Sequence, residues 1–210
     1  MEFRTLVGDS TARLRRQLSF LVTLLVIMWL LELVDVVFLS QALNGLGVWP
    51  RQLLGLWGVL LMPFLHGGLA HLAANTLPFL VLGWLVMWRR TTDFVAVTAI
   101  TTLLTGLTLW LFGSSHAVYI GASGIIFGYF GFLVFRGYFE RSPQSLLVAL
   151  LVIFLYGGLI LGVVPQRSGV SWEAHLLGFI SGALCARFLA RSRAAEAPPP
   201  VIFRSDAEEL

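Results

Sequence analysis

Six long apolar runs dominate this sequence and constrain its fold more than any other feature. Counted between polar residues or Pro/Gly breaks, they lie near residues 17–39, 68–88, 94–112, 121–139, 144–163 and 172–190. A membrane-spanning helix needs about 20 apolar residues. Because 58% of the residues are hydrophobic and only 12% are charged, an ordinary soluble domain is excluded. The sequence predicts an all-α polytopic membrane protein with a bundle of six transmembrane helices.

One further apolar stretch, "LLGLWGVLLMPFL" at positions 53–65, does not fit this count. Its 13 residues contain Gly55, Gly58 and Pro63, so it is too short and too interrupted to cross the membrane. We expect an interfacial or re-entrant segment, because irregular backbone at membrane depth must be enclosed by protein.

The arginines predict the orientation. With six spans, both termini share one side, and most arginines fall on that side, whereas only Arg51 and Arg167 fall on the other. The majority are Arg4, Arg13, Arg15, Arg16, Arg89, Arg90, Arg136, Arg141, Arg187, Arg191 and Arg193. The positive-inside rule therefore places both termini in the cytoplasm.

Three regions follow from these counts. Residues 1–16 are predicted to form a cytoplasmic N-terminal segment, residues 17–191 the membrane domain, and residues 192–210 a disordered, Pro-rich cytoplasmic tail. The net charge of +3 is spread along the chain and does not indicate a nucleic-acid partner. Cys185, the sole cysteine, can build neither a disulfide framework nor a cysteine-based metal site.

Ionisable and amide side chains are costly in hydrocarbon and are therefore candidates for function. His71 and Asn75, Ser123, and His175 lie within about two turns of the starts of the second, fourth and sixth runs. All three runs enter from the outer side, so these residues are expected at one depth. The alternative for each residue alone is helix packing.

Glycines predict which helices meet. Gly124, Gly128 and Gly131 form a smooth stripe after Ser123, and Gly178 and Gly182 form a G-x-x-x-G after His175. Small residues at this spacing let membrane helices approach closely. If the stripes face each other, the hydroxyl and the imidazole come within hydrogen-bonding range, as a base-activated nucleophile requires.

His71 and Asn75 project from one helix face and, with the Ser123 backbone N–H, could stabilise an oxyanion.

The remaining polar residues have plainer interpretations. We expect Glu32 and Asp35 to be paired or solvated at the outer rim and His66 to anchor its loop. His116 is expected to be solvated.

At these residues the sequence resembles the rhomboid family of intramembrane serine proteases. The resemblance lies in "FLHGGLAHLAANTLPFLVLG" (64–83), "GASG" (121–124) and "AHLLGFISG" (174–182). It implies Ser123 as nucleophile and His175 as general base, without an aspartate. It also implies an oxyanion hole formed by His71, Asn75 and the Ser123 amide.

The resemblance further implies the compact six-helix bacterial form in the inner (plasma) membrane. Its partners would be transmembrane protein substrates and the lipid bilayer, and it would use no metal or other cofactor. Gly121, Gly124, Phe127 and Gly178 would support the site. Two positions depart from the family pattern: Phe127 replaces a frequent tyrosine, and "VWPRQLLGLWG" replaces a frequent Trp-Arg pair.

Two other functions are compatible with an apolar bundle that carries a few polar residues. A catalytically inactive rhomboid-like protein that binds transmembrane helices usually lacks the serine or the histidine, and both are present here. A small transporter or channel would spread its polar residues across the membrane, whereas here they gather near one face. Zinc and aspartyl protease chemistries are disfavoured, because the spans contain neither H-E-x-x-H nor an aspartate pair.

Overall fold

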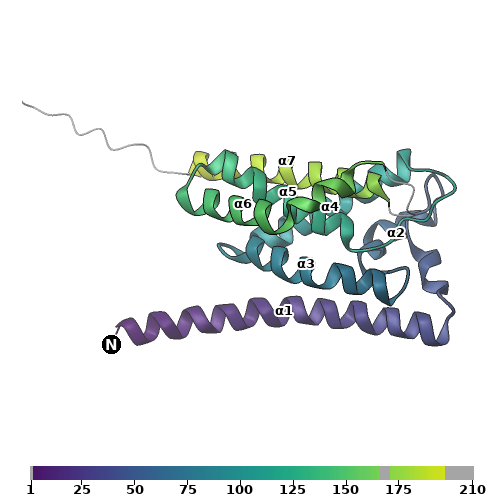
Figure 1. Cartoon of the computed structure of the whole chain (residues 1–210), viewed down its shortest axis with the longest axis horizontal. Helices are drawn as coiled ribbons and strands as arrows, with labels where there is room; N and C mark the ends of the chain where they lie inside the picture. The colour runs from purple at the N-terminus through teal and green to yellow at the C-terminus, as the bar shows by residue number, and fades with distance from the viewer. Residues whose placement is uncertain (1, 166–170, 197–210) are drawn as a thin grey trace, which may run out of the picture.

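The computed structural model describes residues 2–165 and 171–196, and these residues are almost entirely helical (Figure 1). The α-helices are α1 (Glu2–Phe38), α2 (Gly55–Leu61), α3 (Leu69–Met87), α4 (Thr91–Phe112), α5 (Ser123–Glu140), α6 (Pro143–Tyr156) and α7 (Trp172–Glu196). The 3₁₀ segments are η1 (Ala42–Leu46), η2 (Met62–Phe64) and η3 (Gly157–Val163).

Five helical segments among the described residues are long and apolar enough to cross a membrane. They lie in α1, α3, α4, the α6–η3 segment and α7. Each coincides with one of the apolar runs, and the protein is a multi-pass membrane protein. Helix α1 is longer than its run, because the polar residues before position 17 continue the same helix.

The fourth run forms α5, which lies at the centre of the bundle and not at its lipid-facing edge (Figure 1). Most of its 18 residues are buried. Its glycines and its polar ends, with Arg136 and Glu140 at the C-terminal end, keep α5 out of the five segments that are apolar enough to cross a membrane by composition. Because neighbouring helices enclose α5, its polar residues can face the interior of the bundle and not lipid.

The short apolar stretch at 53–65 forms α2 and η2 and does not span, as its length predicted. Gly58 lies so close to the backbone of Gly47 that a Cβ would come 2.1 Å from its carbonyl oxygen. On the other side, a Cβ at Gly106 of α4 would lie 2.7 Å from Val59. Glycines on both sides therefore let α2 lie against the bundle.

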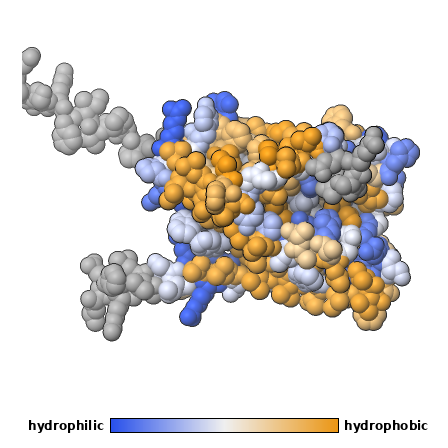
Figure 2. All heavy atoms as spheres, viewed as in Figure 1, coloured by the Kyte–Doolittle hydropathy of each residue, from blue (hydrophilic) through white to orange (hydrophobic). Residues whose placement is uncertain are grey.

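The start of α1 and the end of α7 lie at the same end of the bundle (Figure 1). At that end Arg89 pairs with Glu140 at 2.6 Å, and Arg136 pairs with Glu140 at 3.1 Å and with Asp93 at 3.6 Å. On the face in view, hydrophilic residues gather toward the two ends, with a largely hydrophobic band between them (Figure 2). This pattern is that of a bundle that crosses a membrane. The predicted tail includes residues 197–210, which lie outside the described residues, whereas 192–196 continue α7.

Helices α5 and α7 make the closest contact of the bundle. A Cβ at Gly178 would lie 2.1 Å from the Gly124 carbonyl oxygen, and one at Gly182 would lie 1.9 Å from that of Gly128. A Cβ at Gly131 would in turn lie 2.3 Å from the Phe179 carbonyl oxygen. The prediction that the two glycine stripes face each other is confirmed.

Candidate active site

Ser123 is the first residue of α5, whose start lies at the end of the bundle away from the start of α1 and the end of α7 (Figure 1). The turn before it depends on Gly121, whose φ of +112° is rarely adopted by other residues. A Cβ at Gly121 would lie 2.9 Å from His71 Cε1 and 3.8 Å from Ser123 Oγ. Gly121 therefore permits the serine and His71 to share one small space.

His175 lies on the first turns of α7, between an aromatic ring and a backbone carbonyl. The Phe127 ring stacks on the imidazole with centroids 4.1 Å apart and planes 7° apart. Nδ1 lies 3.0 Å from the Gly162 carbonyl oxygen in η3. Because a carbonyl can only accept, Nδ1 must carry the proton of the neutral ring. Nε2 is thereby left unprotonated, which is the form a general base requires.

Ser123 and His175 are brought to one place by the contacts around them. Phe127, which stacks on His175, lies one turn after Ser123 on α5. A Cβ added to Gly124, the residue after Ser123, would lie 3.6 Å from the carbonyl oxygen of Ala174, the residue before His175. In the described ranges no direct hydrogen bond joins the hydroxyl to the imidazole. Such bonds are often long in unliganded enzymes and shorten when substrate binds.

His71 and Asn75 lie on one face of α3, and both have hydrogen-bond donors to offer. The Gly67 N–H donates to His71 Nδ1 at 3.3 Å, so the proton of the neutral ring is on Nε2. His71 Nε2 would be 3.1 Å from a Cβ at Gly121, on the side that leads to Ser123. Asn75 Nδ2 is buried with no hydrogen-bond partner among the described residues.

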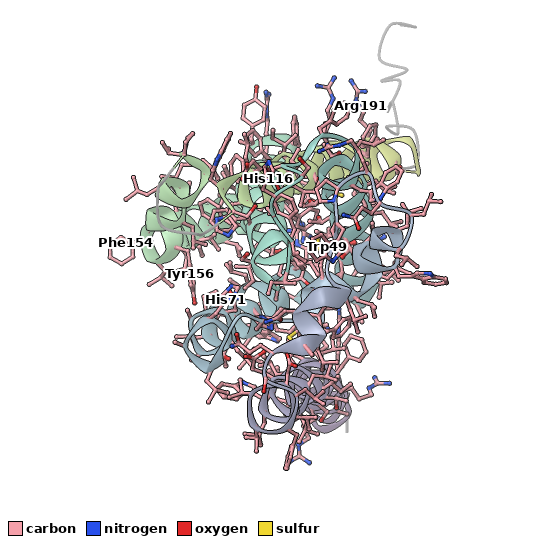
Figure 3. The ribbon with its side chains drawn as sticks, turned by 90° about the vertical axis from the view of Figure 1, so that its right-hand side faces the viewer. Trp49, His71, His116, Phe154, Tyr156 and Arg191 are labelled. Atoms are coloured by element: carbon pink, nitrogen blue, oxygen red, sulfur yellow. The ribbon has the colours of Figure 1, made fainter. Side chains whose placement is uncertain are left out.

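Figure 3 views the molecule from the end that carries these residues and shows His71 within this end, with Phe154 of α6 at its periphery. The Ser123 backbone N–H has no partner within α5, because the first N–H groups of a helix lack one. Three donors of the kind that stabilises an oxyanion thus come from α3 and from the start of α5.

His66 anchors its loop, as the sequence indicated, and does so from a fully buried position. Its Nε2 accepts the Ala122 N–H at 3.4 Å, and its ring lies 5.2 Å from that of His71. Burial lowers the pKa of His66 to about 4, and the nearby His71 contributes in the same direction. His66 therefore stays neutral and holds the turn before Ser123.

The loop that departs from the family pattern is held against the end of α4. Arg51 donates to the carbonyl oxygens of Leu111 and Gly113 at 3.3 and 2.9 Å, and its N–H bonds to Trp110. Trp49 donates to the Gly45 carbonyl within the loop itself. A tryptophan and an arginine thus hold this loop through hydrogen bonds, although Pro50 separates them in the sequence.

One of the sequence expectations needs correction. Glu32 and Asp35 are each 2% exposed, so they are not solvated at a rim. Glu32 lies against the turn before α3, whereas Asp35 accepts the Leu43 N–H in the segment that follows α1. The Gly162 carbonyl was not predicted as the partner of His175, because a backbone oxygen leaves no signal in a sequence. His116 is exposed, as expected. Among the described residues, no group of three or more His, Cys, Asp or Glu side chains could hold a metal ion.

The rhomboid domain family matches residues 54–192, which is most of the chain. The chain belongs to the rhomboid family. The family match extends from α2 to α7 and includes every residue placed at the candidate site above. Helix α1 lies outside the matched residues.

Relatives of this rhomboid include both uncharacterized and named proteins. It is 41% identical over 177 residues to an uncharacterized protein of Mycobacterium tuberculosis (strain H37Rv), covering 80% of this chain and 73% of the relative. It is 32% identical over 135 residues to RHOMBOID-like protein 4 of Arabidopsis thaliana, covering 61% and 32% respectively. A putative rhomboid protein of Acanthamoeba polyphaga mimivirus is 31% identical over 130 residues, covering 59% and 69%.

Proposed function

We propose that this rhomboid is an active intramembrane serine protease that cuts other membrane proteins in or near a transmembrane segment. The observation that carries the proposal is the pair of ring tautomers at the site. The Gly162 carbonyl leaves His175 with a basic Nε2, and the Gly67 N–H leaves His71 with a donor at Nε2. One ring is set to accept a proton and the other to donate a hydrogen bond.

In the proposed reaction, Ser123 Oγ attacks the carbonyl carbon of the scissile bond while His175 Nε2 takes the hydroxyl proton. The oxygen of the tetrahedral intermediate gains a negative charge, which the donors of His71, Asn75 and the Ser123 backbone stabilise. His175 then gives the proton to the leaving amine. His175 then deprotonates a water molecule that attacks the acyl ester, and it returns this proton to Ser123 Oγ as the ester bond breaks and the acid product leaves.

The proposal also sets the topology. We take α5 as a sixth spanning helix, because it runs through the centre of the bundle, and we place both termini in the cytoplasm of a bacterium, with the protein in the inner membrane. The proposed site then lies near the outer surface, where water can reach it. The mycobacterial relatives support a bacterial membrane.

Reconstituted protein tests the activity. The purified chain is mixed in liposomes with single-span membrane proteins whose helices carry small, helix-destabilising residues, and the products are mapped by mass spectrometry. We expect cleavage that Ser123→Ala or His175→Ala reduces by about a thousandfold or more, because the two residues act as a unit. His116→Ala, in an exposed loop, is the matched control and should cleave normally. Helix binding without cleavage would instead support an inactive binding protein.

A further inference from the structure

Glu32 of α1 is a buried carboxylate that the proposed mechanism does not use. It is 2% exposed, and its Oε1 has no hydrogen-bond partner among the described residues. Burying a carboxylate in an apolar helix is costly, so its position needs a reason.

The Glu32 carboxylate lies beside the backbone N–H groups of Gly68 and His66. These residues form the turn immediately before α3, and Gly68, with a φ of +117°, is the N-cap of that helix. No side chain of the cap itself bonds to the helix start. A negative charge near a helix N-terminus compensates its free N–H groups and its dipole. Glu32 thus supplies from α1 what the start of α3 lacks.

The same turn holds both halves of the proposed site. On one side, the Gly67 N–H fixes the His71 ring by donating to Nδ1. On the other, His66 Nε2 accepts the Ala122 N–H at 3.4 Å. The preceding segment η2 adds a second bond, in which the Met62 carbonyl accepts the Gly121 N–H at 2.8 Å. Ala122 and Gly121 directly precede Ser123. A shift of the turn would therefore move the His71 donor and the nucleophile relative to each other.

We propose that Glu32 is a positioning residue for this site and acts through the turn at residues 66–68. The inference rests on the proposed proteolytic function and extends it to α1, which lies outside the residues that match the rhomboid domain. Helix α1 is then part of the machinery that sets the distance between the oxyanion donors and Ser123, and not only a membrane anchor.

Asp35 offers a matched comparison on the same helix. It is also 2% exposed, but its Oδ1 accepts the Leu43 N–H at 2.9 Å. That contact holds the segment that follows α1 and does not touch the turn at residues 66–68. Removing the charge of Asp35 should therefore affect stability in a similar way without moving the proposed site.

The test compares Glu32→Gln with Asp35→Asn in the full-length reconstituted protein. Glutamine keeps the size of the side chain but removes its charge and one acceptor oxygen. We expect Glu32→Gln to lower kcat on the order of 10- to 100-fold with KM nearly unchanged, as small displacements of catalytic groups do. Asp35→Asn should keep the wild-type kcat even if its unfolding temperature falls as much as that of Glu32→Gln. Hydrogen exchange should become faster at the Gly68 and Ala122 amides in Glu32→Gln only.

Two results would overturn the inference. The first is a Glu32→Gln protein with wild-type kcat and wild-type exchange at those amides. The second is an equal loss of kcat in Asp35→Asn at matched stability, which would make both residues merely structural. If the wild-type protein cleaves nothing, the proteolytic proposal fails, while exchange at the Gly68 and Ala122 amides still decides whether Glu32 holds the turn.

Discussion

At the scale of single residues, the proposed chemistry depends on a neutral His175. Its Nδ1–H is committed to the Gly162 carbonyl, so the ring acts as a base only while Nε2 carries no proton. We expect kcat to fall about tenfold per pH unit once the ring becomes protonated, because a protonated Nε2 cannot take the serine proton. His66 does not interfere near neutral pH, because burial lowers its pKa to about 4. A rate that is independent of pH across the acid range, measured in liposomes, would contradict this role.

The turn before the serine gives a second prediction at this scale. Gly121→Ala introduces a Cβ at a φ of +112° and within 2.9 Å of the His71 ring. We expect a loss of about 1–3 kcal/mol in the free energy of unfolding, from backbone strain, together with reduced cleavage. Gly45→Ala is the control, since a Cβ there meets nothing within 4 Å. The stability of the two variants is compared by denaturation in detergent. Equal stability would contradict the claim that the turn before Ser123 requires glycine at position 121.

At the scale of helices, the contact between α5 and α7 is asymmetric at one pair of glycines, Gly124 and Gly178. A Cβ on Gly178 would collide with backbone of α5 at 2.1 Å, whereas a Cβ on Gly124 would make ordinary contacts at 3.5 and 3.6 Å. We expect Gly178→Ala to lower the unfolding free energy by about 1–3 kcal/mol, since backbone cannot move aside cheaply. Gly124→Ala should be far milder. Similar thermal unfolding temperatures for the two variants would show that α5 and α7 do not meet as described.

The helices were largely predictable because their signals are local. Apolar runs indicated every spanning segment, and the length of 53–65 excluded a further span. The contact of α5 with α7 was also predictable, since the glycine spacing on each helix by itself indicates a face for close packing.

The contacts of the candidate site were less predictable from the sequence. Glu32 meets a turn more than 30 residues further along, and Gly162 contributes only a carbonyl. Such contacts are set by the assembled bundle and not by local pattern.

At the scale of the whole molecule, the arginines predict one orientation, with the proposed site on the outer side of the membrane. His116 lies in the exposed loop between α4 and α5, and Arg191 lies near the end of α7, at the end of the bundle where α1 starts (Figure 1). With Cys185 replaced by alanine, His116→Cys should react with a membrane-impermeant maleimide in intact cells. Arg191→Cys should react only after permeabilisation. The reverse pattern would place the proposed site on the cytoplasmic side and contradict the topology.

The central claim is that Ser123 is a nucleophile activated by His175, and covalent labelling tests it most directly. Purified protein is treated with a fluorophosphonate, and the modified residue is identified by mass spectrometry. We predict a single adduct on Ser123, absent in Ser123→Ala and formed about a thousandfold or more slowly in His175→Ala. Labelling of Ser123→Ala to the same extent as the wild-type protein, or an adduct elsewhere in the chain, would contradict the account.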